Sequence, residues 1–234
     1  MAEQYNLHET DPEFMERWEA FAGDEVLHEE GQQLEEPTRS LAVLAALMGV
    51  QALDVYRCLL PQALKAGLTP VMAKEAVYQA VDYLGFGKVY PFLLVTNEIL
   101  QQMGVPLPLE GQTTTTLENR LEKGVEAQAE IFGAHMREAW KSGHINRWLA
   151  ANCFGDYYTR KGLTLNQREM ITFCFLAAQG GCEPQLTAHA KGNMNLGNSK
   201  AFLIKVISQC LPYVGYPRSL NAIACVNRAA EENG

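Results

Sequence analysis

Apolar residues recur every three to four positions along most of the chain, and the alternation expected of β-strands is almost absent. A first amphipathic helix is predicted from Pro12 to about Gly23, because its aromatic residues fall on one face. Further helices are predicted over residues 38–49, 53–65, 69–85, 89–104 and 117–143. The pattern therefore predicts an all-α fold.

Capping and breaking residues mark where these helices begin and end. Thr69-Pro70 places a capping hydroxyl before a first-turn proline, and Ala66-Gly67 gives the preceding helix a glycine stop. By the same rule, Thr38 is expected to cap the helix that ends at Gly49. Residues 105–116, VPLPLEGQTTTT, contain two prolines, one glycine and four threonines and follow neither apolar period. They are the clearest linker signal in the chain.

The second half of the chain repeats the first half at a nearly constant offset. Five identical pairs lie 130 positions apart: Trp18 and Trp148, Gly67 and Gly197, Gln79 and Gln209, Tyr83 and Tyr213, and Gly85 and Gly215. We interpret the chain as two tandem copies of one helical unit, over residues 1–104 and 144–234. A linker loop and a long connecting helix over residues 105–143 join the copies. We expect the copies to pack as one compact body about a pseudo-two-fold axis.

Composition and charge narrow the class of protein. The net charge of −8 comes without a cluster of Lys or Arg, which argues against a nucleic-acid partner. No run approaches the roughly 20 apolar residues of a membrane helix. The start, MAEQYNLHETDPEF, is acidic and lacks the order of a secretion signal. Six scattered cysteines without a Cys-x-x-Cys pair favour buried thiols over a disulfide framework or a metal site. We expect a soluble, cytoplasmic protein that uses neither metal nor cofactor.

Residues 167–189 concentrate a carboxylate, two thiols and an imidazole along helical sequence. Gln185 and His189 follow Cys182 by three and seven positions, so the three side chains share one helix face. Upstream, Glu169 follows Arg168 at the start of an apolar run that could return it to that face. In the first copy the corresponding residues are apolar: Ala52, Val55 and Leu59. Since a face needed only for packing would look alike in both copies, the asymmetry predicts one functional site per chain.

Both copies resemble a known family. An apolar helix after a basic–acidic pair, then Gly-Gly-Cys, a histidine seven residues later and a closing PYVGYPRSLNAI are similar to the carboxymuconolactone decarboxylase family, which includes alkyl hydroperoxidase D. The resemblance covers roughly residues 34–103 and 145–229. It implies an all-helical fold and a homo-oligomer, a trimer with pseudo-hexameric form.

The family's motif is only partly present. In the hydroperoxidase branch the motif is a glutamate, then Cys-x-x-Cys, then a histidine four residues later. Cys182 and His189 match the first cysteine and the histidine, and Glu169 matches the glutamate with one extra residue in the spacing, but Gln185 stands where the second cysteine should be. An intramolecular disulfide cycle cannot close without that thiol. In the decarboxylase branch the cysteine pair is absent and a histidine remains for proton transfer, so the chain resembles both branches in part.

The resemblance implies a first hypothesis, cofactor-free decarboxylation of a small anionic lactone or oxo-acid. His189 would protonate the carbon left by CO₂, since an imidazole titrates near neutral pH. Glu169 would fix its tautomer or shuttle the proton. Arg168 would steer the anionic substrate, and Gln185 would contribute to binding it.

Two alternatives stay open. In the first, Cys182 is the nucleophile of a thiol peroxidase: the start of a helix at Glu183-Pro184 would lower its pKa, and an external reductant would resolve the sulfenic acid. In the second, the chain is a non-catalytic small-molecule-binding or assembly protein that kept the fold. The other histidines, His8, His28, His135 and His144, are interpreted as surface residues.

Overall fold

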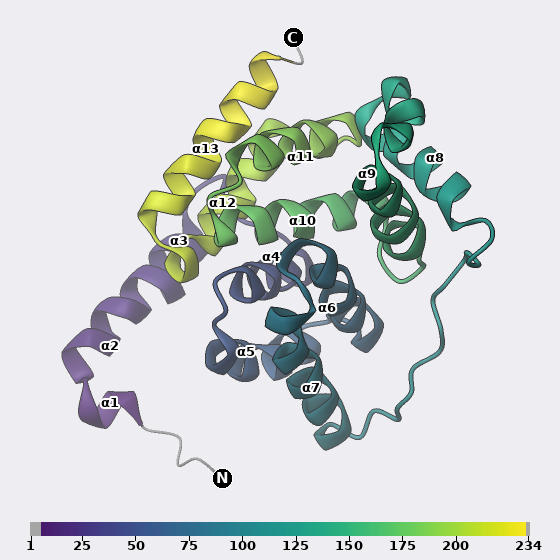
Figure 1. The fold of residues 1–234 in the computed structure, drawn as a ribbon. Coiled ribbons are helices and arrows are strands. Elements are labelled where there is room, and N and C mark those ends of the chain that lie inside the picture. Colours follow the sequence, from purple (N-terminus) through teal and green to yellow (C-terminus); the bar gives the residue numbers. More distant parts are fainter. Residues whose placement is uncertain (1–5, 233–234) are drawn as a thin grey trace.

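The computed structural model describes residues 6–232, and within this range the chain is helical without a β-strand (Figure 1). The first half contains α1 (Leu7–Thr10), α2 (Pro12–Trp18), the π-helical η1 (Glu19–Glu25), α3 (Val26–His28), α4 (Glu36–Gly49), α5 (Leu53–Lys65), α6 (Pro70–Leu84) and α7 (Phe86–Gln102). The all-α prediction is confirmed. Residues 1–5 belong to the stretch for which no secretion signal is predicted, and they lie outside the described residues.

The second half follows the same order of elements. It contains α8 (Arg120–Phe132), the 3₁₀-helical η2 (Ala134–Ser142), α9 (His144–Trp148), the π-helical η3 (Leu149–Tyr158), α10 (Leu165–Gln179), α11 (Glu183–Asn195), α12 (Lys200–Val214) and α13 (Tyr216–Glu231). Both ends of α11 and of α12 lie 130 positions after the ends of α5 and α6. A π-helical segment precedes the apolar helix in each half. The tandem repeat read from the sequence is therefore a repeat of structure.

The core forms where α4 and α10, the corresponding helices of the two halves, pack side by side near the centre of the molecule (Figure 1). All ten residues from Ser40 to Gly49 are buried, as are Phe173 and Phe175 on α10. Burial of each large apolar side chain contributes roughly 1.5–3 kcal/mol. This contact unites the two copies into one body.

The segment between the copies differs in part from the prediction. Residues 105–116 carry no regular secondary structure, as their composition predicts. The single helix predicted over residues 117–143 is wrong, because α8 ends at Phe132 and a 3₁₀ helix follows. Gly133 causes the break: its φ of 104° lies in the left-handed region, which an α-helix cannot contain.

Two helix ends lie at other residues than the sequence predicted. Helix α4 begins at Glu36 with Pro37 in its first turn, so Thr38 lies inside the helix and does not cap it. The first amphipathic helix passes Gly23 through η1 and reaches His28 in α3. The cap at Thr69 is confirmed, because its side chain accepts a hydrogen bond from the Met72 amide at 3.1 Å.

Candidate functional site

A cavity of about 590 Å³ lies between helices of both copies and the connecting segment. Its lining comes from α6, α8, η2, η3, α10 and α11. Aromatic and aliphatic side chains form much of its wall, among them Phe132, Phe154 and Leu176. Of the residues predicted from sequence, the lining includes Cys182, Gln185 and His189. A pocket of this size, which combines apolar wall with polar side chains, fits a small organic molecule.

His189 and Glu169 form a buried pair at the floor of this cavity. The Nδ1 atom of His189 lies 2.9 Å from Oε2 and 3.1 Å from Oε1 of Glu169. Glu169 is fully buried, and His189 is 8% exposed. The imidazole ring is held by edge contacts with Tyr83 and Phe132, at centroid distances of 5.5 and 5.3 Å. Since the carboxylate engages Nδ1, Nε2 is the nitrogen left for a ligand.

The local sequence explains how the two side chains meet. Thr164 and Gln167 form a capping box that starts α10, which brings Glu169 into the first turns of that helix. The chain then reverses at Gly180-Gly181 and begins α11, on which His189 lies nearly two turns inside. Asn193 fastens the helices together, because its amide donates to the backbone carbonyls of Glu169 at 2.9 Å and of His189 at 2.8 Å.

Close packing at Gly192 is a further condition for this pair. A Cβ atom there would lie 2.9 Å from Oε2 of Glu169 and 2.8 Å from Ile131 of α8. Only glycine leaves room for the carboxylate, α8 and α11 to meet. The site therefore depends on the connecting segment as well as on the second copy.

Two tyrosines extend the pair into a hydrogen-bonded chain. The hydroxyl of Tyr158 donates to Oε1 of Glu169 at 2.7 Å and lies 2.8 Å from the hydroxyl of Tyr83. The thiol of Cys153 contacts the Tyr83 hydroxyl at 3.6 Å. Burial, with the charge of Glu169 adding to it, raises the pKa of both tyrosines well above the ordinary value. Both hydroxyls are therefore neutral groups that can pass a proton or fix the carboxylate.

Cys182 lies on the cavity wall as the N-cap residue of α11, half-buried, with Sγ 3.5 Å from the carbonyl of Leu176. The predicted lowering of its pKa is wrong. Burial raises the pKa of the thiol, and the charge of Glu183 adds to the rise, while the amide of Gln179 acts in the opposite direction.

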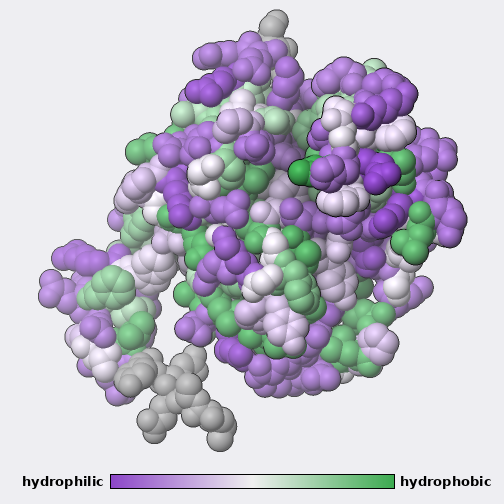
Figure 2. Space-filling model, viewed as in Figure 1, coloured by the Kyte–Doolittle hydropathy of each residue, from purple (hydrophilic) through white to green (hydrophobic). Residues whose placement is uncertain are grey.

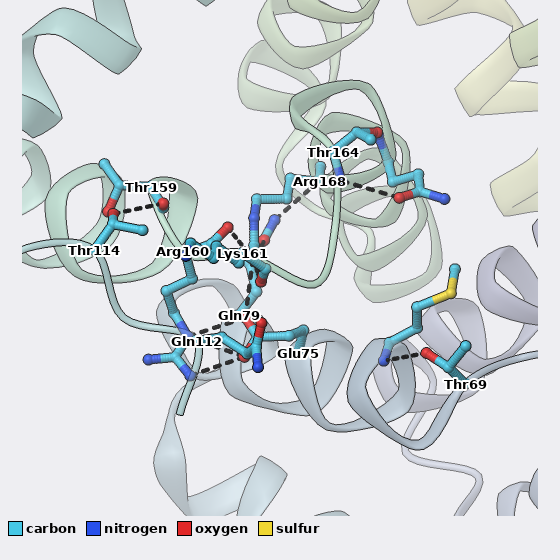
Figure 3. A network of polar contacts seen from close by, with 12 residues as sticks. Thr69, Glu75, Gln79, Gln112, Thr114, Thr159, Arg160, Lys161, Thr164 and Arg168 are labelled. Carbon is cyan, nitrogen blue, oxygen red and sulfur yellow. Dashed lines mark hydrogen bonds and ion pairs between the residues drawn. The ribbon is translucent and has the colours of Figure 1, made fainter. Parts of the chain in front are cut away.

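Arg168 does not line the cavity, so it is not in place for the predicted contact with an anionic substrate there. Its side chain is fully buried and binds Glu75 at 2.9 Å and the amide oxygen of Gln79 at 2.9 Å (Figure 3). Arg160 pairs with the same glutamate. The physical reason is the helix period: neighbours in a helix point about 100° apart, so Arg168 faces α6 when Glu169 faces α11. Its role is to hold the two copies together.

Asp82 is a lining residue that the sequence interpretation missed. It is largely buried, and burial raises the pKa of its carboxyl to about 7, with a hydrogen bond from Cys153 opposing and the charge of Asp156 adding to the rise. Tyr158 was also missed. Comparison of the two copies marks both positions. The residue 130 positions after Asp82 is Pro212, and the residue 132 positions before Tyr158 is Val26. Each polar side chain is therefore absent from the other copy, as that of His189 is.

The equivalent place in the first copy holds a smaller cavity of about 220 Å³. Leu59 stands there in place of His189, and Tyr213 in place of Tyr83. Its charges are already paired, because Arg39 binds both carboxylate oxygens of Glu36 at 2.9 Å. The imidazole–carboxylate pair is thus confined to the second-copy site.

Within residues 6–232 no three His, Cys, Asp or Glu side chains gather closely enough to hold a metal ion. None of the helices described there has both the length and the apolar character required to span a membrane. The four histidines interpreted as surface residues are all exposed, although His135 also borders the cavity. Four of the six cysteines are buried, as predicted for most of them.

Comparisons with known proteins match both copies. The model described as "Carboxymuconolactone decarboxylase family" matches residues 12–98 and 144–228. A 4-carboxymuconolactone decarboxylase from Acinetobacter baylyi is 25% identical over 123 residues, which are 50% of this chain and 91% of that protein. A crystal structure described as that of a gamma-carboxymuconolactone decarboxylase subunit from Burkholderia xenovorans LB400 has a TM-score of 0.50 at 19% identity, over 97% of this chain and 90% of that one. The last likeness is one of fold.

Proposed function

The chain belongs to the carboxymuconolactone decarboxylase family, and we therefore propose that it decarboxylates a small anionic lactone or oxo-acid, without a cofactor, in the cavity above His189. The observation that carries this proposal is the buried pair of His189 and Glu169, 2.9 Å apart, at the floor of that cavity. A buried carboxylate on Nδ1 fixes the tautomer of an imidazole and stabilises its protonated form.

The proposed reaction needs one proton donor and a place for the carboxylate. The bond between the carboxylate carbon and its neighbour breaks, CO₂ leaves, and the electron pair stays on the substrate. His189 then transfers the proton on Nε2 to that carbon and is reprotonated from solvent. Lys191 and Gln185, both in the lining, are the proposed contacts for the substrate's carboxylate. The apolar wall removes water from the carboxylate, which favours loss of its charge as CO₂.

We also propose that the chain forms a homo-oligomer, the trimer implied by the family. Exposed apolar side chains support this, because they repeat between the copies on α7 and α13: Phe86 (58% exposed), Tyr90 (47%), Leu94 (49%), Tyr216 (58%) and Leu220 (62%). Figure 2 shows hydrophobic patches among hydrophilic residues near the place of α6 and α7. Light scattering on the purified protein tests the proposal, and a monomer at micromolar concentration contradicts it.

The six free thiols support a reducing, cytoplasmic location, which we propose for this protein. The function itself is tested by measuring CO₂ release from a panel of carboxylated lactones and oxo-acids. The wild-type chain is compared with His189→Gln and with His144→Gln, a matched change of an exposed histidine outside the cavity. Release by the wild type and by His144→Gln, but not by His189→Gln, supports the function; no release from any acid contradicts it.

A further inference from the structure

We propose that Asp82 is a second catalytic residue of this cavity, whose carboxyl group hydrogen-bonds the substrate's carbonyl oxygen as that oxygen receives the electron pair released with CO₂. This inference rests on the decarboxylase function proposed above and narrows its substrate. The acid must carry its carboxylate β to a carbonyl group, directly or through a conjugated double bond, because only then can the electron pair reach that oxygen.

The position of Asp82 and the surroundings of its carboxyl group point to this role. Asp82 lines the same cavity as His189. Its Oδ2 atom is buried and has no hydrogen-bond partner among residues 6–232, so no donor stabilises a negative charge on that oxygen. The carboxyl group is therefore suited to meet a ligand as a neutral acid.

The two copies differ at this position as they do at His189. The residue 130 positions after Asp82 is Pro212, although the adjacent Tyr83 has its counterpart in Tyr213. A carboxyl group is therefore present only at the cavity that contains the imidazole, and it comes from α6 of the first copy. Packing alone does not account for it, because proline serves in the equivalent helix.

The surroundings keep the carboxyl group suited to donate a hydrogen bond. The titratable groups around it are Cys153, Asp156 and Tyr157 on η3, Arg120 on α8, and His189 and Lys191 on α11. Arg120 is bound to Asp156 at 2.6 Å, and Cys153 is a neutral thiol because burial raises its pKa well above the ordinary value. No cation among the described residues contacts Asp82 directly. A carboxyl group buried in this way holds its proton to higher pH than one in water.

The proposed step balances without another reactant. The carboxylate–carbon bond breaks, and its electron pair moves through the conjugated system to the carbonyl oxygen. Asp82 donates a hydrogen bond to the developing enolate oxygen while keeping its proton. The pair then returns to form a C–H bond with the proton from His189 Nε2. Asp82 ends the cycle as it began, and solvent restores the proton of His189.

A binding experiment tests Asp82 without needing turnover. The probe is 2,4-dinitrophenolate, a planar enolate mimic that stays an anion from about pH 5 to 9. Binding is measured in a His189→Gln background, so that the imidazole contributes no pH dependence. We expect affinity to fall at least about tenfold as pH rises through about 7, because ionised Asp82 repels the probe. Adding Asp82→Asn should abolish this pH dependence, whereas Asp54→Asn, a change at an exposed residue of α5, should retain it.

Infrared spectroscopy gives a further measurement that keeps the outcomes distinct. Infrared spectra of the unmodified chain should show a protonated carboxyl band near pH 6 that disappears by about pH 8 and shifts when the probe binds. This check does not depend on whether the variants fold. Probe binding that is independent of pH, or a band that the probe leaves unchanged, overturns the role of Asp82. If the band and binding behave as expected but no acid releases CO₂, the decarboxylase function fails and the oxygen-binding subsite stands.

Discussion

Nδ1 of His189 lies 2.9 Å from Oε2 of Glu169, a buried contact between helices α10 and α11 that spans 20 residues of sequence. The carboxylate has no exposure, so it cannot bind the substrate and acts through the imidazole. Its second oxygen accepts from Tyr158 at 2.7 Å. The pair is thus held from both sides, which fixes the ring and presents Nε2 to a ligand.

Replacing Glu169 by Gln should lower kcat by about 10²- to 10⁴-fold with little change in KM, because the amide preserves shape but no longer stabilises the imidazolium or fixes the tautomer. Steady-state CO₂ release measures this. Glu126→Gln, at an exposed position on α8, is the control and should match the wild type. A Glu169→Gln enzyme with normal kcat would show that the proton comes from elsewhere.

Replacing Tyr158 by Phe should destabilise the protein by about 1–3 kcal/mol, because the Glu169 carboxylate and the Tyr83 hydroxyl both lose a buried partner. Urea denaturation measures the free energy of unfolding. Tyr157→Phe is the matched control, since this neighbour is half-buried and makes no hydrogen bond to Glu169. Equal stability of the two variants would contradict the proposed support of the carboxylate by Tyr158.

Some features of the fold and of the site can be predicted from the sequence alone. Helix spacing and the 130-residue offset were sufficient to predict the all-α tandem fold, because both are properties of residue order. They also singled out His189 and its carboxylate. Asp82 and Tyr158 also differ between the copies, but they lie on α6 and η3, far in sequence from His189, so their relation to the site comes only from packing: Asp82 lines the cavity and Tyr158 binds Glu169.

For Arg168 the sequence predicted a role in the site that its position does not support. A basic residue beside a carboxylate of the candidate site suggests anion binding, but neighbouring helix positions face different partners. Whether the helix face that carries Arg168 meets solvent or another helix depends on tertiary structure. Here the partner is Glu75 on α6, which no local pattern connects to residue 168.

Replacing Arg168 by Met should destabilise the protein by about 3–5 kcal/mol, because Glu75 is left as a buried charge with only Arg160 for a partner. The remaining folded enzyme should keep its KM, since Arg168 is outside the cavity. Arg57→Met removes an exposed ion pair with Glu98 and should cost no more than about 1 kcal/mol. A raised KM without loss of stability would restore the substrate-binding role.

Cys182 should react slowly with hydrogen peroxide at neutral pH, because burial raises its pKa and leaves little thiolate. The exposed thiol of Cys58 is the internal comparison and should be oxidised first. Mass spectrometry of peptides after timed treatment measures both sites. The rate at Cys182 should rise with pH as the thiolate forms. Rapid sulfenic acid formation at Cys182 alone would instead support the thiol peroxidase alternative.

Asp82 should make the folded protein less stable as pH rises from about 4 to about 7. Its pKa is raised from an ordinary 3.8 to about 7, so within this window the folded state binds a proton that the unfolded state has lost. The stabilisation is complete below the unfolded pKa and is lost as pH passes the folded one.

The size of the effect should be on the order of 2 to 4 kcal/mol across this window. Because other carboxylates titrate there too, the informative quantity is the difference between the wild type and Asp82→Asn in urea denaturation at each pH. The wild type should lose stability relative to this variant as pH rises. Parallel curves would show that Asp82 titrates alike in both states, and that the cavity does not hold its proton.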